Sequence, residues 1–530
     1  MTPTASELGG VGAQNWAPTP PSSGRGGARG RARRRRPLGT WGWHLLTRTR
    51  RGEAVIAVGI GVGLWIALAI GFFVGIGVEV LLSLFLSAVV LVAMIRRPLL
   101  ALRLTFVVVP ASVFVLSLAL TFGIPPGVVR GGALLKDSVV IATVIAGYRA
   151  HRARGAVMAP LDRIGLAYLG LVGTWYLLTP LIALEPLTSD ARLIALREQG
   201  LFVGMFLGVR WLAPTREERR RLLGWAVGAA ALLALGGAYQ WLDPAGFIQR
   251  TLYDAGMLRY YQEVAGLSGR SLSETLGWMR TDPVRVGSVL IAPFGFADMM
   301  VTAFAAVVAT VSHRVDRRLG LLLMGLFALA VLWSGTRVNL VALGIVVLAV
   351  LIDGRGVSER TRVQVVAVGL VAVLAFAPTV LGSRLLAQDN EESNEGHRNE
   401  LVSAAEKIVD RPLGYGLGSD GAVQRRFEIE GKTVSGNTVL AVGVQSGVVT
   451  MAAFIALLVA ILRELEARRR RAPHDELVRA SYLMVVGGLV AVSTHQGWLD
   501  LTSGTFIWAA IALGLPEVDE TDAEREGVAP

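Results

Sequence analysis

The sequence predicts an all-α membrane protein, a polytopic transmembrane helical bundle of about fourteen spans with a large, partly helical outer loop. Composition is the first reason, since 53% of the 530 residues are hydrophobic and 17% are charged. The second is that apolar runs of about 20 residues, which cross a bilayer core as helices, recur from residue 54 almost to residue 515. The third is that basic residues are distributed among the connections of these runs as a membrane topology requires.

Residues 1–50 are predicted to form a disordered, basic cytoplasmic tail. They are rich in Gly, Pro, Ser and Arg, contain the run RGRARRRRPLG, and have too little apolar content to fold. These arginines either fix the membrane topology or bind anionic lipid. The rest of the chain divides into a transmembrane domain at 51–515 and an acidic cytoplasmic tail at 516–530.

The predicted spans follow the apolar runs in order. They are residues 54–74, 77–95, 99–122, 131–149, 162–184, 191–212, 221–242, 286–311, 317–335, 337–353, 363–381, 437–462, 478–495 and 502–515. With both termini in the cytoplasm, every inner connection is basic, as the positive-inside rule requires. Two outer connections, 243–285 and 382–436, are long and carry charges of both signs, so hydrated chemistry is expected there.

Composition also excludes some classes of site. Cysteine is absent, which excludes disulfides and thiolate metal sites. The net charge of +12 does not require a nucleic-acid partner, because basic residues in a membrane protein chiefly fix its orientation.

Two arginines lie at the outer membrane edge, against the positive-inside rule. Arg285 begins a span in MRTDPVRVGSVLIAPFG, with Arg280 close by, and Arg337 lies in the tight outer turn of LWSGTRVNLVALG. Each guanidinium can point two donors at a phosphate. One such residue could instead extend to lipid headgroups, but two at one outer face favour a shared anion site.

Asp298, in APFGFADMMVTAF, is expected near the middle of its span, where a carboxylate costs about 3 kcal/mol on insertion scales. It therefore needs a partner. That partner is either a structural hydrogen bond to a neighbouring helix or a proton or cation relay.

The second outer loop contains NEGHRNELVSAAEKIVDRPLGYGLGSDG. His397, Leu401, Ala404 and Ile408 recur at helical spacing and predict a helix of about three turns on the membrane surface. His397 and Arg398 would then lie at its N-terminal end, where free amides favour an anion. His397 is either a base or phosphate contact, or a structural residue. The GxGxG run that follows is a weak nucleotide signal, and it is also typical of a turn that returns the loop to the membrane.

His495 and Asp500, in STHQGWLDLTSG, are also expected to face outward. They either complete a site or cap and anchor the chain at the interface beside Trp498.

The order of these features resembles the O-antigen ligase and O-antigen polymerase superfamily over roughly residues 190–515. The span beginning Arg285-Val286-Gly287, the turn Ser334-Gly335-Thr336-Arg337, and HRNELVSAAEKIVDRPLGYGLGS within a large outer loop are similar to that family's pattern. Many members have a His-Asn pair before the span after the loop, where the His is taken as the catalytic base. This chain keeps Asn437 but has Gly436 in place of the His, so either His397 takes its role or the branch is divergent or inactive.

The resemblance implies a metal-independent glycosyltransferase of the GT-C type, without a cofactor, in the bacterial cytoplasmic (inner) membrane. It implies that a glycan passes from a polyprenyl pyrophosphate carrier to a glycan or lipid acceptor at the outer face. His397, Arg337 and Arg285 are the expected catalytic residues, with the arginines holding the donor pyrophosphate. Arg398, Arg280 and Asn437 are expected to bind substrate, and no metal ligand is expected.

Two other functions fit the same topology. A flippase for lipid-linked glycans, or another polytopic transporter, would need a continuous polar path through the spans, which the sequence does not display. A cell-wall polymerase of the SEDS type is similar in plan, but its acidic outer-loop signature is not found.

Overall fold

The structure is a computed structural model. It describes residues 78–182, 187–267, 272, 276–277, 284–311, 316–353, 359, 362–368, 389–421, 436–500 and 502–517. The predicted tail at 1–50, the span 54–74, most of the span 363–381, most of the tail 516–530 and Arg280 lie outside these residues. Contacts divide the chain into Met1–Glu53 and Ala54–Pro530, and all that follows concerns the second unit.

Helices make up the regular structure of the described residues, which contain no strand. The first half of the chain forms α3 (Val78–Arg96), α4 (Pro98–Thr121), α5 (Pro126–Arg154), α6 (Pro160–Ile182), α7 (Ser189–Leu212), α8 (Arg216–Leu242), α9 (Pro244–Ile248), the π-helix η1 (Gln249–Asp254), α10 (Met257–Arg259) and the π-helix η2 (Tyr260–Val264). The second half forms the 3-10 turn η4 (Ser288–Leu290), α12 (Pro293–Val311), α13 (Arg317–Trp333), α14 (Arg337–Ile352), α16 (Asp389–Asp410), α18 (Thr438–Arg471), α19 (Glu476–Val492) and α20 (Ser503–Ala512).

The all-α fold class is therefore confirmed, and most helices begin and end within a few residues of the predicted spans, with α12 and α18 as exceptions. Among the described residues, five helices are long and apolar enough to cross a membrane: Pro98–Thr121, Pro160–Leu181, Arg216–Leu242, Pro293–Val311 and Thr438–Arg471. Shorter apolar helices are found at Phe85–Arg96, Arg337–Ile352 and Ser503–Ala512. The count of fourteen spans is not confirmed and stays a prediction.

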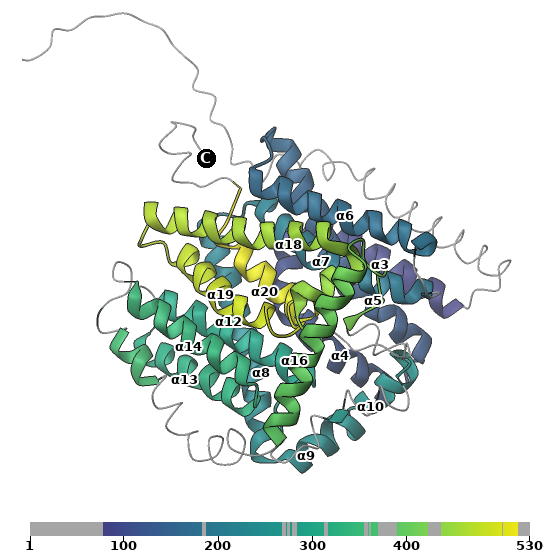
Figure 1. The fold of residues 1–530 in the computed structure, drawn as a ribbon. Coiled ribbons are helices and arrows are strands. Elements are labelled where there is room, and N and C mark those ends of the chain that lie inside the picture. The colour runs from purple at the N-terminus through teal and green to yellow at the C-terminus, as the bar shows by residue number, and fades with distance from the viewer. Residues whose placement is uncertain are drawn as a thin grey trace, which may run out of the picture. The chain divides into compact units, whose positions relative to one another are not determined.

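Helix α12 is the centre of the second half of the fold. Almost every residue from Pro293 to Val311 is buried, because α12 packs against α8, α13, α14, α19 and α20 (Figure 1). A helix that is apolar on all sides has no solvent face to turn outward, so it takes the interior position.

Aromatic side chains join α12's neighbours to the first half of the fold. Trp508 of α20 lies 4.9 Å from Phe202 of α7 and 6.3 Å from Phe454 of α18, measured between ring centroids. Tyr168 of α6 lies 5.5 Å from the same Phe454. All four rings are buried, and pairs at these separations stabilise packing beyond the burial of their area.

The ends of helices predicted to be cytoplasmic meet at one end of the bundle, around the residues that follow α20. Arg219 donates to the Leu513 carbonyl at 3.0 Å, and Arg210 donates to the Leu515 carbonyl at 2.6 Å. Arg468 donates to the Pro516 carbonyl at 3.0 Å. His151 and Arg154 of α5 both pair with the Glu517 carboxylate. We call residues 513–517 with these partners the C-terminal clamp.

The run of glycines after α16 forms hydrogen bonds with backbone groups that a break in α18 leaves free. Gly447 has a φ of 75° and interrupts α18, which frees the carbonyls of Val444 and Gln445. The amides of Tyr415 and Gly416 donate to these carbonyls at 2.8 and 3.0 Å. The Val448 amide donates to the Pro412 carbonyl at 2.8 Å. The glycines thus return the loop to the bundle, the second of the two interpretations that the sequence left open.

Replacement of Gly447 should therefore weaken the fold. A Cβ at this position would lie 2.6 Å from the Pro412 carbonyl oxygen, on a backbone whose positive φ disfavours L side chains. We expect Gly447→Ala to destabilise the protein by at least about 1–2 kcal/mol, seen as a lower midpoint of thermal aggregation in detergent. Gly173→Ala in α6 is the matched control, because nothing lies within 4 Å of its Cβ and alanine favours a helix. Equal midpoints for the two variants would show that the positive φ of Gly447 and its close contact with Pro412 are not required for stability.

Candidate functional site

Arg285 lies on a short non-helical segment that is fixed by hydrogen bonds to two helices. The Gln240 Oε1 of α8 accepts from the amides of Gly287 and Ser288 at 3.0 and 2.8 Å. The Val286 amide donates to the Trp333 carbonyl at the end of α13, at 3.1 Å. A buried amide side chain thus takes the place of the helical partners that these backbone groups lack.

The predicted helical start at residue 286 is therefore wrong, since α12 begins at Pro293. Ser288 and Ile291 have φ angles of 52° and 61°, which a helix cannot accommodate. Gly236 of α8 makes room for the turn, because a Cβ there would lie 2.6 Å from the Ser288 Oγ. Asp298 consequently lies in the second turn of α12 and not near the middle of a span.

Arg337 is the first residue of α14 and follows directly from a tight turn. Gly335 in this turn has a φ of 63°, and the hydroxyls of Ser334 and Thr336 are 2.7 Å apart. The hydrogen bond between Val286 and Trp333 joins this turn to the segment of Arg285. Both arginine side chains are half-buried.

His397 lies inside α16 and not at its N-terminal end, so the predicted start of this helix is wrong. The helix begins at Asp389, and the free amides of its first turn are remote from His397. The upstream residues are polar and therefore show no apolar periodicity, which is why the pattern located only the part from His397 onward. The C-terminal part behaves as expected, because Ala404 and Ile408 are buried against Val444 of α18.

The His397 imidazole is paired with Glu400 and subject to the charge of both arginines. Its Nδ1 lies 3.3 Å from the Glu400 Oε2, and 59% of the His397 side chain is exposed. The hydrogen bond that His397 donates to Glu400 raises the pKa of His397 above its ordinary value, while burial and the positive charges of Arg285 and Arg337 oppose that rise. The three residues predicted to be catalytic therefore lie within electrostatic reach of one another, although they come from three separate segments.

Gly436 lies against the pair formed by His397 and Glu400. A Cβ at position 436 would be 2.6 Å from the Glu400 Oε2 and 3.7 Å from the His397 Nδ1. The side chains of α16 thus occupy the space into which a side chain at position 436 would project.

The side chain of Asn437, which is expected to bind substrate, forms hydrogen bonds within the protein. Its Oδ1 accepts from the Leu440 amide at 3.0 Å and caps α18, and its Nδ2 donates to the Ser493 carbonyl at 2.5 Å. Thr438 donates to the His495 carbonyl at 2.6 Å. The start of α18 is thereby tied to the end of α19.

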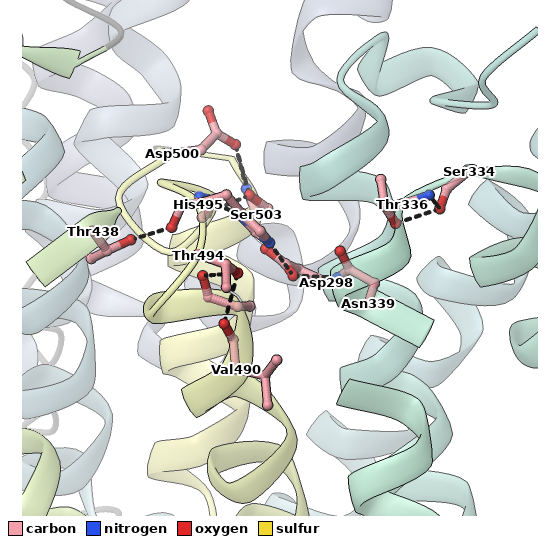
Figure 2. Close-up of polar contacts among 12 residues, drawn as sticks. Asp298, Ser334, Thr336, Asn339, Thr438, Val490, Thr494, His495, Asp500 and Ser503 are labelled. Carbon is pink, nitrogen blue, oxygen red and sulfur yellow. Dashed lines mark hydrogen bonds and ion pairs between the residues drawn. The ribbon is translucent and has the colours of Figure 1, made fainter. Parts of the chain in front are cut away.

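A buried polar cluster connects this region to α12 and α14 (Figure 2). The Asn339 Nδ2 donates to the Asp298 Oδ1 at 2.6 Å, and the His495 Nε2 lies 3.3 Å from the same oxygen. The Gly497 amide donates to the His495 Nδ1 at 2.9 Å, which requires that the ring proton be on Nε2, facing Asp298. All three side chains are at least nine-tenths buried.

The cluster gives Asp298 a hydrogen bond to a neighbouring helix, which was one of its two expected partners. Asn339, which donates this bond, lies two residues after Arg337 on α14. The Asp298 Oδ2 and Asn339 Oδ1 have no hydrogen-bond partner among the described residues. Asp500 caps α20, since its Oδ2 accepts from the Ser503 amide at 2.8 Å. Capping, one of the two roles considered for Asp500, is thus present.

The sequence analysis missed Glu400 and Asn339. Glu400 could have been found from its position three residues after His397 on a predicted helix, where side chains meet. Asn339 could not, because its partner lies on a different helix. Arg398 is exposed on α16, and its expected contact with substrate stays a prediction. Within the described ranges, no group of three or more His, Cys, Asp or Glu side chains is placed to hold a metal ion.

The opposed charges on His397 give a prediction for its titration. Glu400→Gln removes the group that raises the pKa, so His397 should become neutral at a lower pH. Arg337→Gln removes a charge that lowers the pKa, so the ring should become neutral at a higher pH. The pH midpoint of carbethoxylation, read by mass spectrometry of the peptide with His397, measures both shifts. Glu406→Gln, on the same helix, is the control and should leave the midpoint in place; shifts of the same sign in both variants would contradict this geometry.

Comparison with known proteins gives no match to this chain, either from a protein-family profile or from a curated protein. The resemblance described above therefore rests on the quoted motifs, their order and their spacing.

Proposed function

We propose that the protein is a membrane glycosyltransferase that moves a glycan from a polyprenyl pyrophosphate carrier to a hydroxyl of a glycan or lipid acceptor. The supporting observation is that Arg285 and Arg337 both act electrostatically on His397, which is paired with Glu400. Two cations whose charge reaches one base match the two needs of this transfer, namely a site for the leaving pyrophosphate and an acceptor for the hydroxyl proton.

In the proposed step, the acceptor oxygen attacks the anomeric carbon of the donor. The bond from that carbon to the pyrophosphate oxygen breaks, and the polyprenyl pyrophosphate leaves with the electron pair. Arg285 and Arg337 stabilise the negative charge that grows on this leaving group, for which planar guanidinium groups offer paired donors. Because Glu400 holds the Nδ1 proton of His397, the Nε2 is the nitrogen that takes the proton of the acceptor hydroxyl.

The position of Gly436 supports His397 as the base. The family that the sequence resembles has its histidine at the position corresponding to Gly436. Here the imidazole and carboxylate of α16 lie where that side chain would project. We propose that the base has moved from the start of α18 to α16, with Glu400 orienting it.

The proposal places the reaction at the outer face of a bacterial cytoplasmic membrane, with both termini inside. Two features support this orientation. The helix ends predicted to be inside meet in the C-terminal clamp, which is rich in arginine. The loops predicted to be outside supply the site.

Loss of a guanidinium should slow transfer strongly without unfolding the protein. We expect Arg337→Lys to lower the rate about 10²- to 10³-fold, because a Lys ammonium keeps the charge but loses the paired donors. The readout is the formation of a glycosidic bond by purified protein supplied with a lipid-linked glycan and acceptor. Arg259→Lys is the matched control, since Arg259 pairs with Glu263 on an exposed part of the other outer loop. A normal rate in Arg337→Lys would show that Arg337 does not stabilise the leaving pyrophosphate.

The relocation of the base can be tested by rescue. His397→Ala should abolish transfer, and His397→Ala with Gly436→His should recover a measurable part of it. The new ring would enter the space beside the vacated His397 position, and the end of the Glu400 side chain, 2.6 Å from a Cβ at position 436, would turn aside to admit it. The control is Gly436→Ala in the His397→Ala background, which adds a side chain but no base. Transfer that survives His397→Ala, with the acid limb of its pH profile unchanged, would contradict the assignment. Liposomes in which lipid-linked sugar crosses the bilayer without a new glycosidic bond would favour a flippase instead.

A further inference from the structure

A groove of about 650 Å³ lies at the opposite end of the bundle from the proposed site, between the end of α5 and the start of α6. Its walls are apolar and include Val144, Ile145 and Leu166. Its rim carries Arg149 and Arg152 from α5, and Trp211 from the end of α7 closes one side.

The groove exists because α5 and α7 cross in backbone contact one turn earlier. A Cβ on Gly208 would lie 2.9 Å from the Val144 Cα, so the two helices touch at this point and diverge beyond it. Trp211 follows Gly208 by three residues, and its ring lies 6.1 Å from that of Tyr148. An amphipathic aromatic pair of this kind is typical of the boundary between membrane and water.

The basic residues that end α5 have two different roles. His151 and Arg154 pair with Glu517 in the C-terminal clamp. Arg149 and Arg152, which share a helix face at the i, i+3 spacing, are exposed at the groove. Among the described residues, no acidic side chain pairs with either of them. Two positive charges therefore lie together above an apolar groove.

Trp211 adds to the apolar wall of the groove. The residue is 3% exposed and its indole Nε1 is buried, so the ring meets the groove through its carbon atoms. The two arginines are therefore the groups that can recognise the polar part of a ligand, and the wall can hold its apolar part.

We propose that this groove binds an anionic phospholipid of the surrounding membrane. An acyl chain lies along Val144, Ile145 and Leu166, and the phosphate lies between Arg149 and Arg152. Basic pockets between membrane helices bind anionic headgroups through the same combination of charge and apolar wall. The inference is independent of the proposed glycosyl transfer, since it uses none of the same residues.

Native mass spectrometry of the full-length protein in detergent, titrated with phosphatidylglycerol or phosphatidylcholine of identical acyl chains, tests the proposal. We expect phosphatidylglycerol to bind more tightly, and Arg149→Gln with Arg152→Gln to weaken it by about tenfold or more. Arg96→Gln with Arg97→Gln is the matched control. It removes the same charge from two exposed arginines that do not line the groove, and it should leave the affinity unchanged.

A further variant distinguishes loss of binding from loss of folding. Arg149→Lys with Arg152→Lys keeps both charges and should retain most of the affinity. Equal affinity for the two lipids, or equal loss in the two glutamine pairs, would overturn the proposal. Full competition by soluble glycerophosphoglycerol would also overturn it, because the groove would then hold a headgroup without a lipid.

Discussion

Inside an apolar helical bundle, every backbone amide and carbonyl that leaves a helix must find a partner within the protein, because lipid offers none. Two non-helical stretches satisfy this constraint in different ways. The segment around Arg285 uses the side chain of Gln240 and the carbonyl that ends α13. The glycines after α16 use the groups freed by the break in α18 at Gly447. In the first case the pairing also fixes the segment that carries Arg285, so this part of the candidate site is positioned by a requirement of folding.

This arrangement couples the two halves of the proposed reaction. Arg285 and Arg337 lower the pKa of His397, and Glu400 raises it. A pyrophosphate bound between the arginines would neutralise their charge, so the histidine would become a stronger base once the donor is present. His397 would thus be more basic when the donor is bound, which is when an acceptor can react. The buried contact between Asn339 and Asp298 contributes indirectly, because it holds the first turn of α14, and with it Arg337, against α12.

The sequence predicted most helices well, but it did not predict the non-helical segment before α12 or the true start of α16. Apolar length alone located α4, α6, α8 and α18, because each must match the thickness of a membrane. It placed the start of α12 too early, since Val286 through Ala292 are as apolar as a helix while their backbone is not helical. It placed His397 at a helix end, since a polar helical extension has no periodic signal. Arg285 and Arg337 were singled out because they violate the positive-inside rule, and His397 because it lies in a hydrated loop beside an Arg at a predicted helix start. Asn339 depends on a tertiary contact that no local pattern contains.

The C-terminal clamp has a consequence for biogenesis. Ribosomes make the chain from the N-terminus, so Arg154, Arg210, Arg219 and Arg468 are all inserted before the residues that receive them, which are the last part of the described chain to be synthesised. Until residues 513–517 are made, these guanidinium groups lack the acceptors of the clamp, although Arg210 already has Asp162 and Arg468 already has Glu464 as partners. The final packing of these helix ends therefore follows the synthesis of residues 513–517, and a product terminated before them would leave guanidinium donors without their clamp acceptors, which quality-control proteases could recognise.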